Sequence, residues 1–364
     1  MNCYITRTGS YLPGAAVEND DIHQHLGWLD GEAEVRDTVL AMNGIVRRHY
    51  AQDKEQSPHD VYALGAQAVQ ACLSGGDEAI TFLAAGTTYS PLAAPGFATL
   101  LHSRLQEKSY LDAPVEISSH AGICSSAAAG LVGATRAITT GQHSSALAVG
   151  AEHASEVLKA SQIQPVDDRD QHTNLRNSRW FMSVFLRFML SDGAGAFLLQ
   201  NRPNPNGLSL RVNWTHSLSY AHETSLCMQL DNRTELLSQD VSILSRYLIP
   251  SAAKFLASGL ELHNDTLDSY AIILPHMSSF FFRRKLERII ANHSSDPQHP
   301  VPYWTDLATS GNTGAASIFI MLDHYLQEHE IRDGERILLF IPESGQFNFV
   351  MISLKLLGYS ARII

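Results

Sequence analysis

The stretch SSHAGICSSAAAGLVG, residues 118–133, places one cysteine, Cys124, among serines, alanines and glycines. An inert buried cysteine behaves as a small hydrophobe and usually packs against larger apolar side chains. Tiny neighbours instead let backbone and substrate come close, as a nucleophile at a strand-to-helix turn requires. Because residues 125–141 have a helical composition that ends at Gly141, Cys124 is predicted at a helix N-terminus. That position favours negative charge and is expected to lower the pKa of the thiol.

Strand-like and helix-like segments alternate on both sides of this stretch. Strands are expected at 79–88, 114–120, 145–153, 191–201, 207–219 and 268–278 and twice within 335–357, and helices at 125–141, 236–259 and 313–329. Such alternation predicts βαβ units whose parallel strands are buried between helices. The order of elements repeats, so we expect an N-terminal half, 1–204, and a C-terminal half, 205–364, that meet at the polar segment NRPNPNG.

Charge and cysteine usage exclude several classes of protein. The net charge of 26 − 37 = −11 argues against a general nucleic-acid binder. The four cysteines are far apart and show no CxxC spacing, which favours free thiols in a reducing compartment over disulfides or a zinc site. The N-terminus lacks an apolar signal core, and no apolar run reaches membrane-spanning length. We therefore expect a cytoplasmic protein with no metal, membrane or nucleic-acid partner.

Two further motifs place polar side chains beside predicted elements. His276, in ILPHMSS, directly follows an apolar strand, and Asn312, in SGNTGAAS, opens a helix. Taken alone, a histidine at a strand end is more often structural, and an Asn-Gly turn is first a helix cap. Their order after Cys124 is what makes them candidates for one site.

Motifs along almost the whole chain share this order. They are YLPGAAVENDDI (11–22), NGIVRRHY (43–50), GTTYSPLAAPG (86–96), SDGAGAFLL (191–199), LPHMSS (274–279) and SGNTGAASIF (310–319). Together they resemble the β-ketoacyl-acyl-carrier-protein synthase III family of thiolase-fold condensing enzymes. The resemblance implies an α/β fold in which duplicated βαβαβ halves form a five-layer αβαβα architecture. It also implies a homodimer and an acyl carrier protein as partner.

The family's Cys-His-Asn triad corresponds to Cys124, His276 and Asn312. By resemblance, Cys124 takes an acyl group from a thioester. The other two hold the thioester oxygen of the second substrate, a carrier-bound acyl, β-ketoacyl or malonyl thioester, as a carbon–carbon bond forms. A thiolate is a good nucleophile and forms a thioester that can be passed on. Two neutral N–H donors stabilise charge that appears only in the transition state, an effect of about 10²–10³-fold per donor. No bound cofactor is implied, since phosphopantetheine of acyl carrier protein or coenzyme A carries the substrates.

Departures from the family's pattern indicate the kind of synthase. In LAAPG, Ala94 takes the place of a phenylalanine that closes the acyl tunnel of the partner subunit in housekeeping members, so a longer chain is expected. The approach to Cys124 is longer and adds His120, which either lines the tunnel or caps the strand. The family's terminal glycine-rich turn has become the more polar ESGQFNFV (343–350). These features resemble the dialkylresorcinol and cyclohexanedione ketosynthase/cyclases of secondary metabolism.

Charged residues supply two further candidate roles. Ring closure after condensation could use Glu152 and Arg336, which could equally be strand-end residues that pair structurally. Arg283, Arg284 and Lys285 follow the histidine motif, either as a docking patch for the acidic carrier protein or as a solvated helix face.

Four other functions compete with this one. A fatty-acid-initiating synthase III would need a short-acyl pocket, which Ala94 disfavours. An acyltransferase that makes esters or amides on the same fold would need no enolate-stabilising Asn312. A catalytically inactive partner subunit usually loses the cysteine, and an unrelated cysteine hydrolase would lack the other motifs.

Overall fold

The computed structural model describes residues 1–364 except 52–59, 75–78, 164–177, 234–235 and 359–364. Nine strands form one mixed sheet in the order β11-β12-β13-β8-β1-β7-β6-β4-β5. Their bounds are β1 Tyr4–Tyr11, β4 Phe82–Thr87, β5 Glu116–Ala121, β6 Ser145–Glu152, β7 Gly193–Gln200, β8 Leu210–Ser219, β11 Ile272–Pro275, β12 Arg336–Ile341 and β13 Asn348–Leu356. Every segment predicted as a strand therefore contains one, and β5 ends one residue beyond its predicted segment.

The sheet contains the same arrangement twice. In the N-terminal part, β4 is parallel to β5 and β6, and β7 runs antiparallel between β6 and β1. In the C-terminal part, β11 and β12 are parallel, and β13 runs antiparallel between β12 and β8. The counterpart of β5 is reduced to a single bridge between Ile273 and Tyr303. The expectation of parallel strands thus holds only for part of each half, while the boundary at 204/205 stays a prediction.

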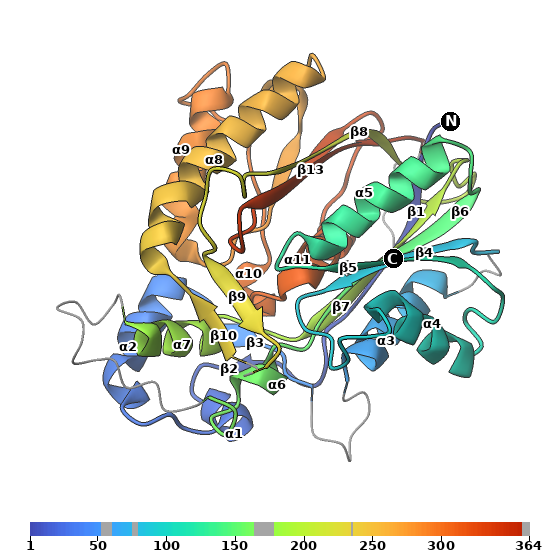
Figure 1. Ribbon diagram of the computed structural model, residues 1–364. Helices are drawn as coiled ribbons and strands as arrows, with labels where there is room; N and C mark the ends of the chain where they lie inside the picture. The colour runs from blue at the N-terminus through green and yellow to red at the C-terminus, as the bar shows by residue number, and fades with distance from the viewer. Residues whose placement is uncertain (52–59, 75–78, 164–177, 234–235, 359–364) are drawn as a thin grey trace.

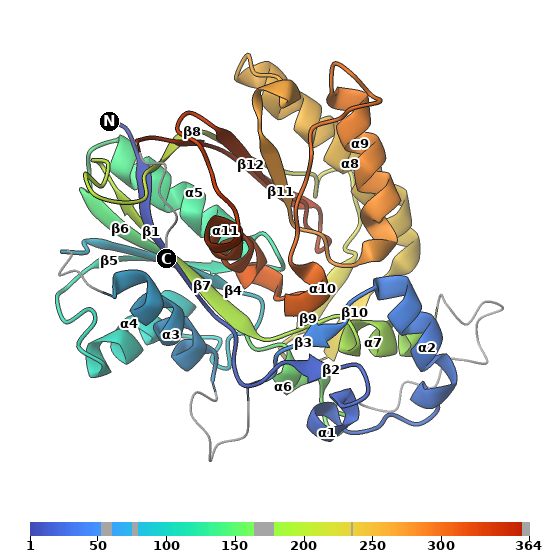
Figure 2. The ribbon, with the colours of Figure 1, turned by 180° about the vertical axis from the view of Figure 1, so that it is seen from behind.

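Helices complete five layers around this sheet (Figures 1 and 2). Their bounds are α3 Val61–Leu73, α4 Phe97–Glu107, α5 Ser126–Thr139, α8 Val241–Leu262, α9 Arg283–His293 and α11 Ser317–Glu328. The α5 and α11 helices lie between the two parts of the sheet, whereas α3 and α4 cover one outer face and α8 and α9 the other. The five-layer αβαβα architecture expected from the resemblance is therefore confirmed.

Glycines let α5 approach the sheet closely. A Cβ on Gly86 of β4 would lie 2.6 Å from the backbone nitrogen of Ala127. A Cβ on Gly150 of β6 would lie 2.9 Å from Cβ of Ala127 and 2.8 Å from the carbonyl oxygen of Ala315. Since real Cβ atoms do not come so close to backbone, a side chain at either glycine would push α5 outward. Small residues in the stretch that contains Cys124, such as Ala127, thus allow α5 to pack closely on β4 and β6. This packing fixes the distance between α5 and the sheet.

The segment predicted as one helix over 236–259 begins as a strand. Residues Leu236–Gln239 form β10, which pairs with β9, Met228–Asp231, in a two-stranded sheet. The Asp240 side chain accepts hydrogen bonds from the backbone N–H groups of Ser242 and Ile243, at 2.8 and 3.1 Å. This N-cap starts α8 at Val241. The prediction was wrong for the first residues because their apolar side chains serve the hairpin.

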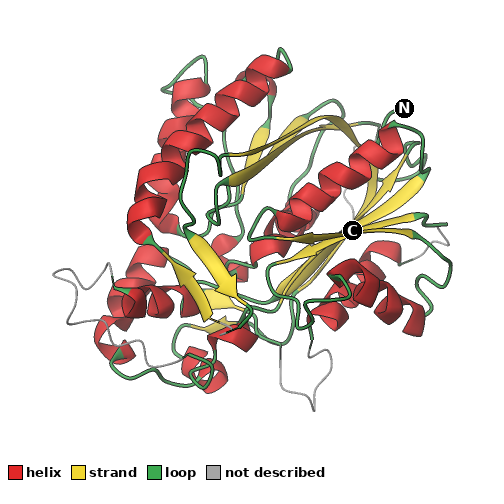
Figure 3. Ribbon diagram, in the orientation of Figure 1, coloured by secondary structure: helices red, strands yellow, loops and turns green. Residues whose placement is uncertain are grey.

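The remaining helices and strands lie mostly at the end of the molecule near this hairpin (Figure 3). They are β2 Val17–Glu18, β3 Arg47–Arg48, α1 Ile22–Leu26, α2 Glu32–Asn43, α6 Ser155–Leu158, α7 Arg179–Arg187 and α10 Leu307–Ser310. Among the described residues, no helix is long and apolar enough to cross a bilayer.

Candidate active site

Cys124 lies in the turn between β5 and α5, where its side chain is buried. Two cavities meet at this residue, because Cys124 is part of the lining of both. Ser278 and Ser344 also line both cavities, so these three residues mark the junction.

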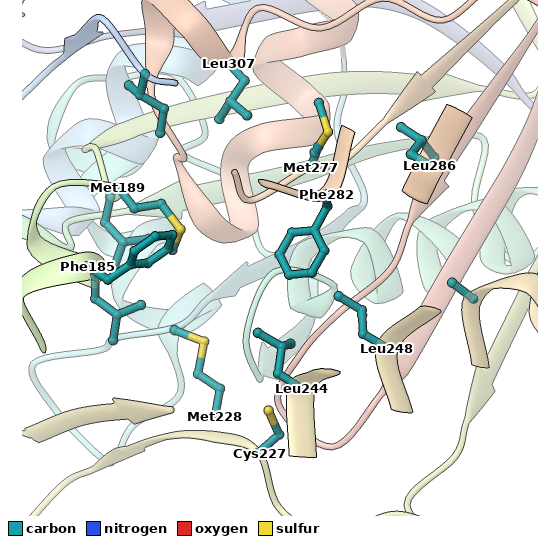
Figure 4. Packing of buried hydrophobic residues seen from close by; sticks show 14 of the residues in the cluster. Phe185, Met189, Cys227, Met228, Leu244, Leu248, Met277, Phe282, Leu286 and Leu307 are labelled. Atoms are coloured by element: carbon teal, nitrogen blue, oxygen red, sulfur yellow. The ribbon is translucent and has the colours of Figure 1, made fainter. Parts of the chain in front are cut away.

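The walls of the two cavities come from different parts of the chain. The apolar lining of the first cavity includes Met189, Leu190, Met228, Leu230 and Leu237, and that of the second includes Leu248, Met277, Phe282, Leu286, Ile289 and Phe340. Figure 4 shows Met189 and Met228 on one side of this cluster and Leu248 and Leu286 on the other. The β9–β10 hairpin closes the first cavity, whereas α8 and α9 enclose the second.

Both cavities are narrow in this conformation. Their volumes are about 30 and 50 Å³, and one water molecule occupies roughly 30 Å³ of the liquid. Met189 and Met228 line the first cavity and Met277 lines the second, and a methionine side chain readily changes rotamer. An acyl chain would therefore enter by displacing side chains, not by filling a preformed tunnel.

His276 lines the second cavity with Cys124. It follows β11, and its Nδ1 lies 2.9 Å from Oγ of Ser317 at the start of α11. Its Nε2 is buried and has no hydrogen-bond partner among the described residues. Burial lowers the pKa of His276 to about 4, so the imidazole is neutral at physiological pH.

Asn312 lines the first cavity with Cys124. Its backbone is held on both sides, because its N–H donates to Met189 O and its carbonyl accepts from Ser191 N–H. Its side-chain Oδ1 accepts from the N–H of Gly314 at 3.0 Å. This bond fixes the orientation of the amide and leaves Nδ2 as the group available for a ligand. The structure thus brings Cys124, His276 and Asn312 around one junction.

The pKa of Cys124 is raised well above its usual value, contrary to the sequence expectation. Burial is the main cause, and the carboxyl groups of Glu343 and Glu152 add to it. Desolvation and nearby negative charge both disfavour a thiolate. The helix N-terminus alone therefore does not supply an ionised nucleophile, and deprotonation must accompany the reaction.

Glu152, at the end of β6, lines the first cavity with Cys124 and Asn312. Its Oε2 accepts hydrogen bonds from Oγ1 of Thr88 at 2.6 Å and from the N–H of Ala315 at 3.0 Å. Burial raises the pKa of Glu152 to about 7. A carboxyl group in this state can take or give a proton near neutral pH.

Arg336 does not reach this site. It begins β12 and forms an ion pair with Asp265, with Tyr270 Oη a further partner 2.9 Å away. Phe340, near the other end of β12, lines the second cavity. Because Arg336 lines neither cavity that contains Cys124, the structure does not join it with Glu152.

The two residues assigned to an acyl tunnel lie outside both cavities. Ala94 is in an exposed loop that follows β4. His120 is on the edge strand β5, where its Nε2 lies 2.9 Å from Oγ of Ser118. This contact lies within β5 itself, and the role of His120 stays a prediction.

The basic residues of α9 lie close to the second cavity. The Nε of Arg283 donates to Oε1 of Glu287 at 3.0 Å, and Nζ of Lys285 is 4.7 Å from the ring centre of Phe281. Arg284 is exposed, and no hydrogen bond or ion pair joins its side chain to another described residue. Phe282, at the same helix start, lines the cavity.

Sequence reasoning missed three polar residues near the junction. Ser344 lines both cavities and accepts a hydrogen bond at 3.2 Å from Nε2 of Gln239, which lines the first. Glu343 precedes Ser344 in the chain and is buried, but it lines neither cavity. Glu343 and Ser344 belong to ESGQFNFV, which was recognised only as a polar replacement of a glycine-rich turn. An acid in place of a glycine next to a site was the signal that could have identified Glu343.

Comparisons with known proteins agree with this geometry. Residues 283–342 match the family described as 3-oxoacyl-[acyl-carrier-protein] synthase III C terminal, a segment that contains Asn312. The chain is 25% identical over 322 residues to a β-ketoacyl-[acyl-carrier-protein] synthase III of Acholeplasma laidlawii, covering 88% of this chain and 89% of the relative.

Solved structures share the fold at low sequence identity. The synthase III FabH of Pseudomonas aeruginosa is 20% identical with a TM-score of 0.73, over 99% of this chain and 100% of that one. OleA of Xanthomonas campestris is 17% identical with a TM-score of 0.76, over 98% of each chain. AbyA1, a tetronic acid condensing enzyme, is 19% identical with a TM-score of 0.75, over 97% and 99%.

Proposed function

We propose which bond this chain makes, on the premise that it is a condensing enzyme of the β-ketoacyl-acyl-carrier-protein synthase III type. It is related to that family over most of its length. The enzyme joins an acyl group on Cys124 to a second, carrier-bound acyl or β-ketoacyl thioester. The observation that carries the proposal is that two separate apolar cavities meet at Cys124. Two chains can thus lie on opposite sides of one sulfur atom.

The first half-reaction transfers an acyl group to the enzyme. The sulfur of Cys124 attacks the thioester carbonyl, and the carrier thiol leaves with the proton that the cysteine gave up. The apolar walls of one cavity then hold the acyl chain. The phosphopantetheine of an acyl carrier protein, or coenzyme A, delivers both substrates.

The second half-reaction forms the carbon–carbon bond. Glu152 removes a proton from the α-carbon of the second thioester, and the enolate attacks the acyl carbonyl on Cys124. When Ser317 donates its hydroxyl hydrogen to Nδ1, the ring proton of His276 lies on Nε2, which has no other partner. This N–H and Nδ2 of Asn312 can both bind the enolate oxygen. The departing Cys124 thiolate takes the proton back from Glu152.

A base in the cavity favours this reaction over fatty-acid initiation. A malonyl thioester yields its carbanion by losing carbon dioxide and needs no base, whereas an acyl or β-ketoacyl thioester must lose a proton. Glu152 lies in the cavity with Cys124 and has a pKa near 7, as such a base requires. A β-ketoacyl substrate would leave further carbonyl groups for ring closure, as in the dialkylresorcinol type of enzyme.

The test offers the enzyme three second substrates on carrier protein: acyl, β-ketoacyl and malonyl. We expect wild-type protein to condense the first two, and Glu152→Gln to lose about 10²–10⁴-fold of that rate. The same variant should load the acyl group on Cys124 as wild type does. If wild type accepts a malonyl carrier, the variant should also keep its condensation rate with that substrate. Mass spectrometry of enzyme and product follows each step, and a cyclic diketone would identify ring closure. Equal loss with malonyl would show that Glu152 supports the Asn312 loop instead.

Carrier-protein docking is proposed at the start of α9. The carrier is acidic and must present its arm at a cavity, and the exposed Arg284 lies on the helix whose Phe282 and Leu286 line that cavity. Arg283 is paired within the helix and Lys285 lies against the rings of Phe281 and Phe282, so Arg284 is the best placed of the three to steer a partner.

A homodimer is proposed through the free edge of β5. This strand pairs with β4 on one side only, and edge strands expose unpaired backbone groups. The neighbouring exposed loop carries Leu92, with half its surface accessible, and Ala94. A second copy paired along β5 would cover both and bring Ala94 to the boundary between subunits. Light scattering should then give twice the chain mass of 40.0 kDa, and a monomer mass would contradict the proposal.

A further inference from the structure

Two serines lie at the point where the two apolar cavities meet. Ser278 and Ser344 line both cavities, as Cys124 does. The other described residues that line the second cavity are apolar, apart from His276. A plain acyl chain consists of methylene groups beyond its carbonyl, so it has no atom there that could bind a hydroxyl group. The two serines therefore suit a substrate that is polar close to its reacting end.

Ser278 brings to the junction a hydroxyl group that the protein itself does not use. It is half-buried in the segment between β11 and α9, two residues after His276. No hydrogen bond joins its side chain to another described residue. The next residue differs, because Oγ of Ser279 accepts from the N–H of Phe281 at 3.1 Å and caps the following turn. Ser278 thus keeps a free hydrogen-bond donor.

The hydroxyl of Ser344 is held in place but is weakly used as a donor. Its Oγ accepts from Nε2 of Gln239, and its own hydrogen can go to Sδ of Met228, 3.4 Å away. A thioether sulfur is a weak acceptor, so a carbonyl oxygen would be a better partner for this hydroxyl. Gln239 and Met228 both line the first cavity, so the donor lies on that side of the junction.

These donors discriminate between chains that differ at the β-carbon. A plain acyl chain would shield the hydroxyl groups from water without replacing the lost hydrogen bonds, which disfavours its binding by about 10- to 100-fold per group. A β-carbonyl oxygen would accept both hydrogen bonds. Because Glu152 and Asn312 line the first cavity with Gln239, the chain concerned is the second substrate.

We propose that Ser278, assisted by Ser344, selects a second substrate that carries a carbonyl oxygen on its β-carbon, an inference that rests on the proposed function. Both hydroxyl groups donate to that oxygen, while His276 and Asn312 bind the thioester oxygen. When the base takes the α-proton, the electron pair left on the α-carbon spreads over both oxygens, and the donors on each side stabilise it. The α-carbon then bonds to the acyl carbon as the bond from that carbon to the enzyme sulfur breaks.

The test compares two carrier-bound second substrates of equal chain length, β-ketoacyl and plain acyl. Single-turnover mixing with acyl-loaded enzyme gives a second-order rate constant for each, and wild type should prefer the β-ketoacyl carrier. Ser278→Ala should lower the β-ketoacyl rate constant by about 10- to 100-fold and should not lower the acyl one. Ser344→Ala should act in the same direction but less strongly, because its hydroxyl hydrogen already has an acceptor.

Ser258→Ala is the matched control and should leave both rate constants unchanged. Ser258 is a serine of α8 that lines neither cavity, and its Oγ donates to Phe255 O at 3.0 Å. Ser278→Thr keeps the hydroxyl group and should retain the wild-type preference.

Two results would overturn the role of Ser278 alone. One is an equal loss with both second substrates in Ser278→Ala, which would show that the residue only supports the shape of the junction. The other is a wild-type preference for the plain acyl carrier. Wild type that condenses neither substrate would contradict the proposed function, and this inference with it.

Discussion

Cys124→Ala protein carries no acyl group after incubation with an acyl thioester, whereas wild type gains the mass of one acyl chain per subunit. The expectation follows from the position of Cys124 where both cavities meet, because no other thiol lines either cavity within the described residues. Without the sulfur, no covalent intermediate forms and condensation is lost entirely. Intact-mass spectrometry measures the loading directly.

Cys72→Ala is the control for this loss. Cys72 is also buried, but it lies on α3, on the outer face of the N-terminal part of the sheet. Its variant should load as wild type does. Covalent loading that persists in Cys124→Ala would mean that another residue is the nucleophile.

Asn312→Asp and His276→Ala each lower the condensation rate by about 10²–10³-fold, which corresponds to roughly 3–4 kcal/mol of transition-state stabilisation. Each change removes one N–H donor to the enolate oxygen, while the aspartate keeps the acceptor that Gly314 N–H uses. Acyl loading on Cys124 should stay within a few-fold of wild type, because no enolate forms in that step. Single-turnover mixing of preloaded enzyme with the second thioester separates the two steps.

If acyl loading fell as much as condensation, the assignment of His276 and Asn312 to the condensation step alone would be wrong. Such a result would show that the two residues support Cys124 instead of the second substrate. His276 should also give no pH dependence between pH 6 and 8, because its pKa near 4 leaves it neutral throughout that range.

The sequence alone determined most strands of the large sheet and the three residue types of the site. Apolar runs that end in small residues predicted the strands, and β4, β6 and β7 lie within them. The order of Cys124, His276 and Asn312 among the surrounding motifs identified the kind of enzyme. These features are local, since a strand or a nucleophile turn is encoded by residues that are neighbours in the chain.

Tertiary structure alone decided the electrostatics and the extent of the site. It raised the pKa of Cys124, which its helix position alone would lower, and it placed Glu152 but not Arg336 in the cavity. It also brought Glu343, more than two hundred residues away, against the segment of Cys124. The reason is that burial and charge–charge interactions depend on which distant segments pack together, and no local pattern records that packing.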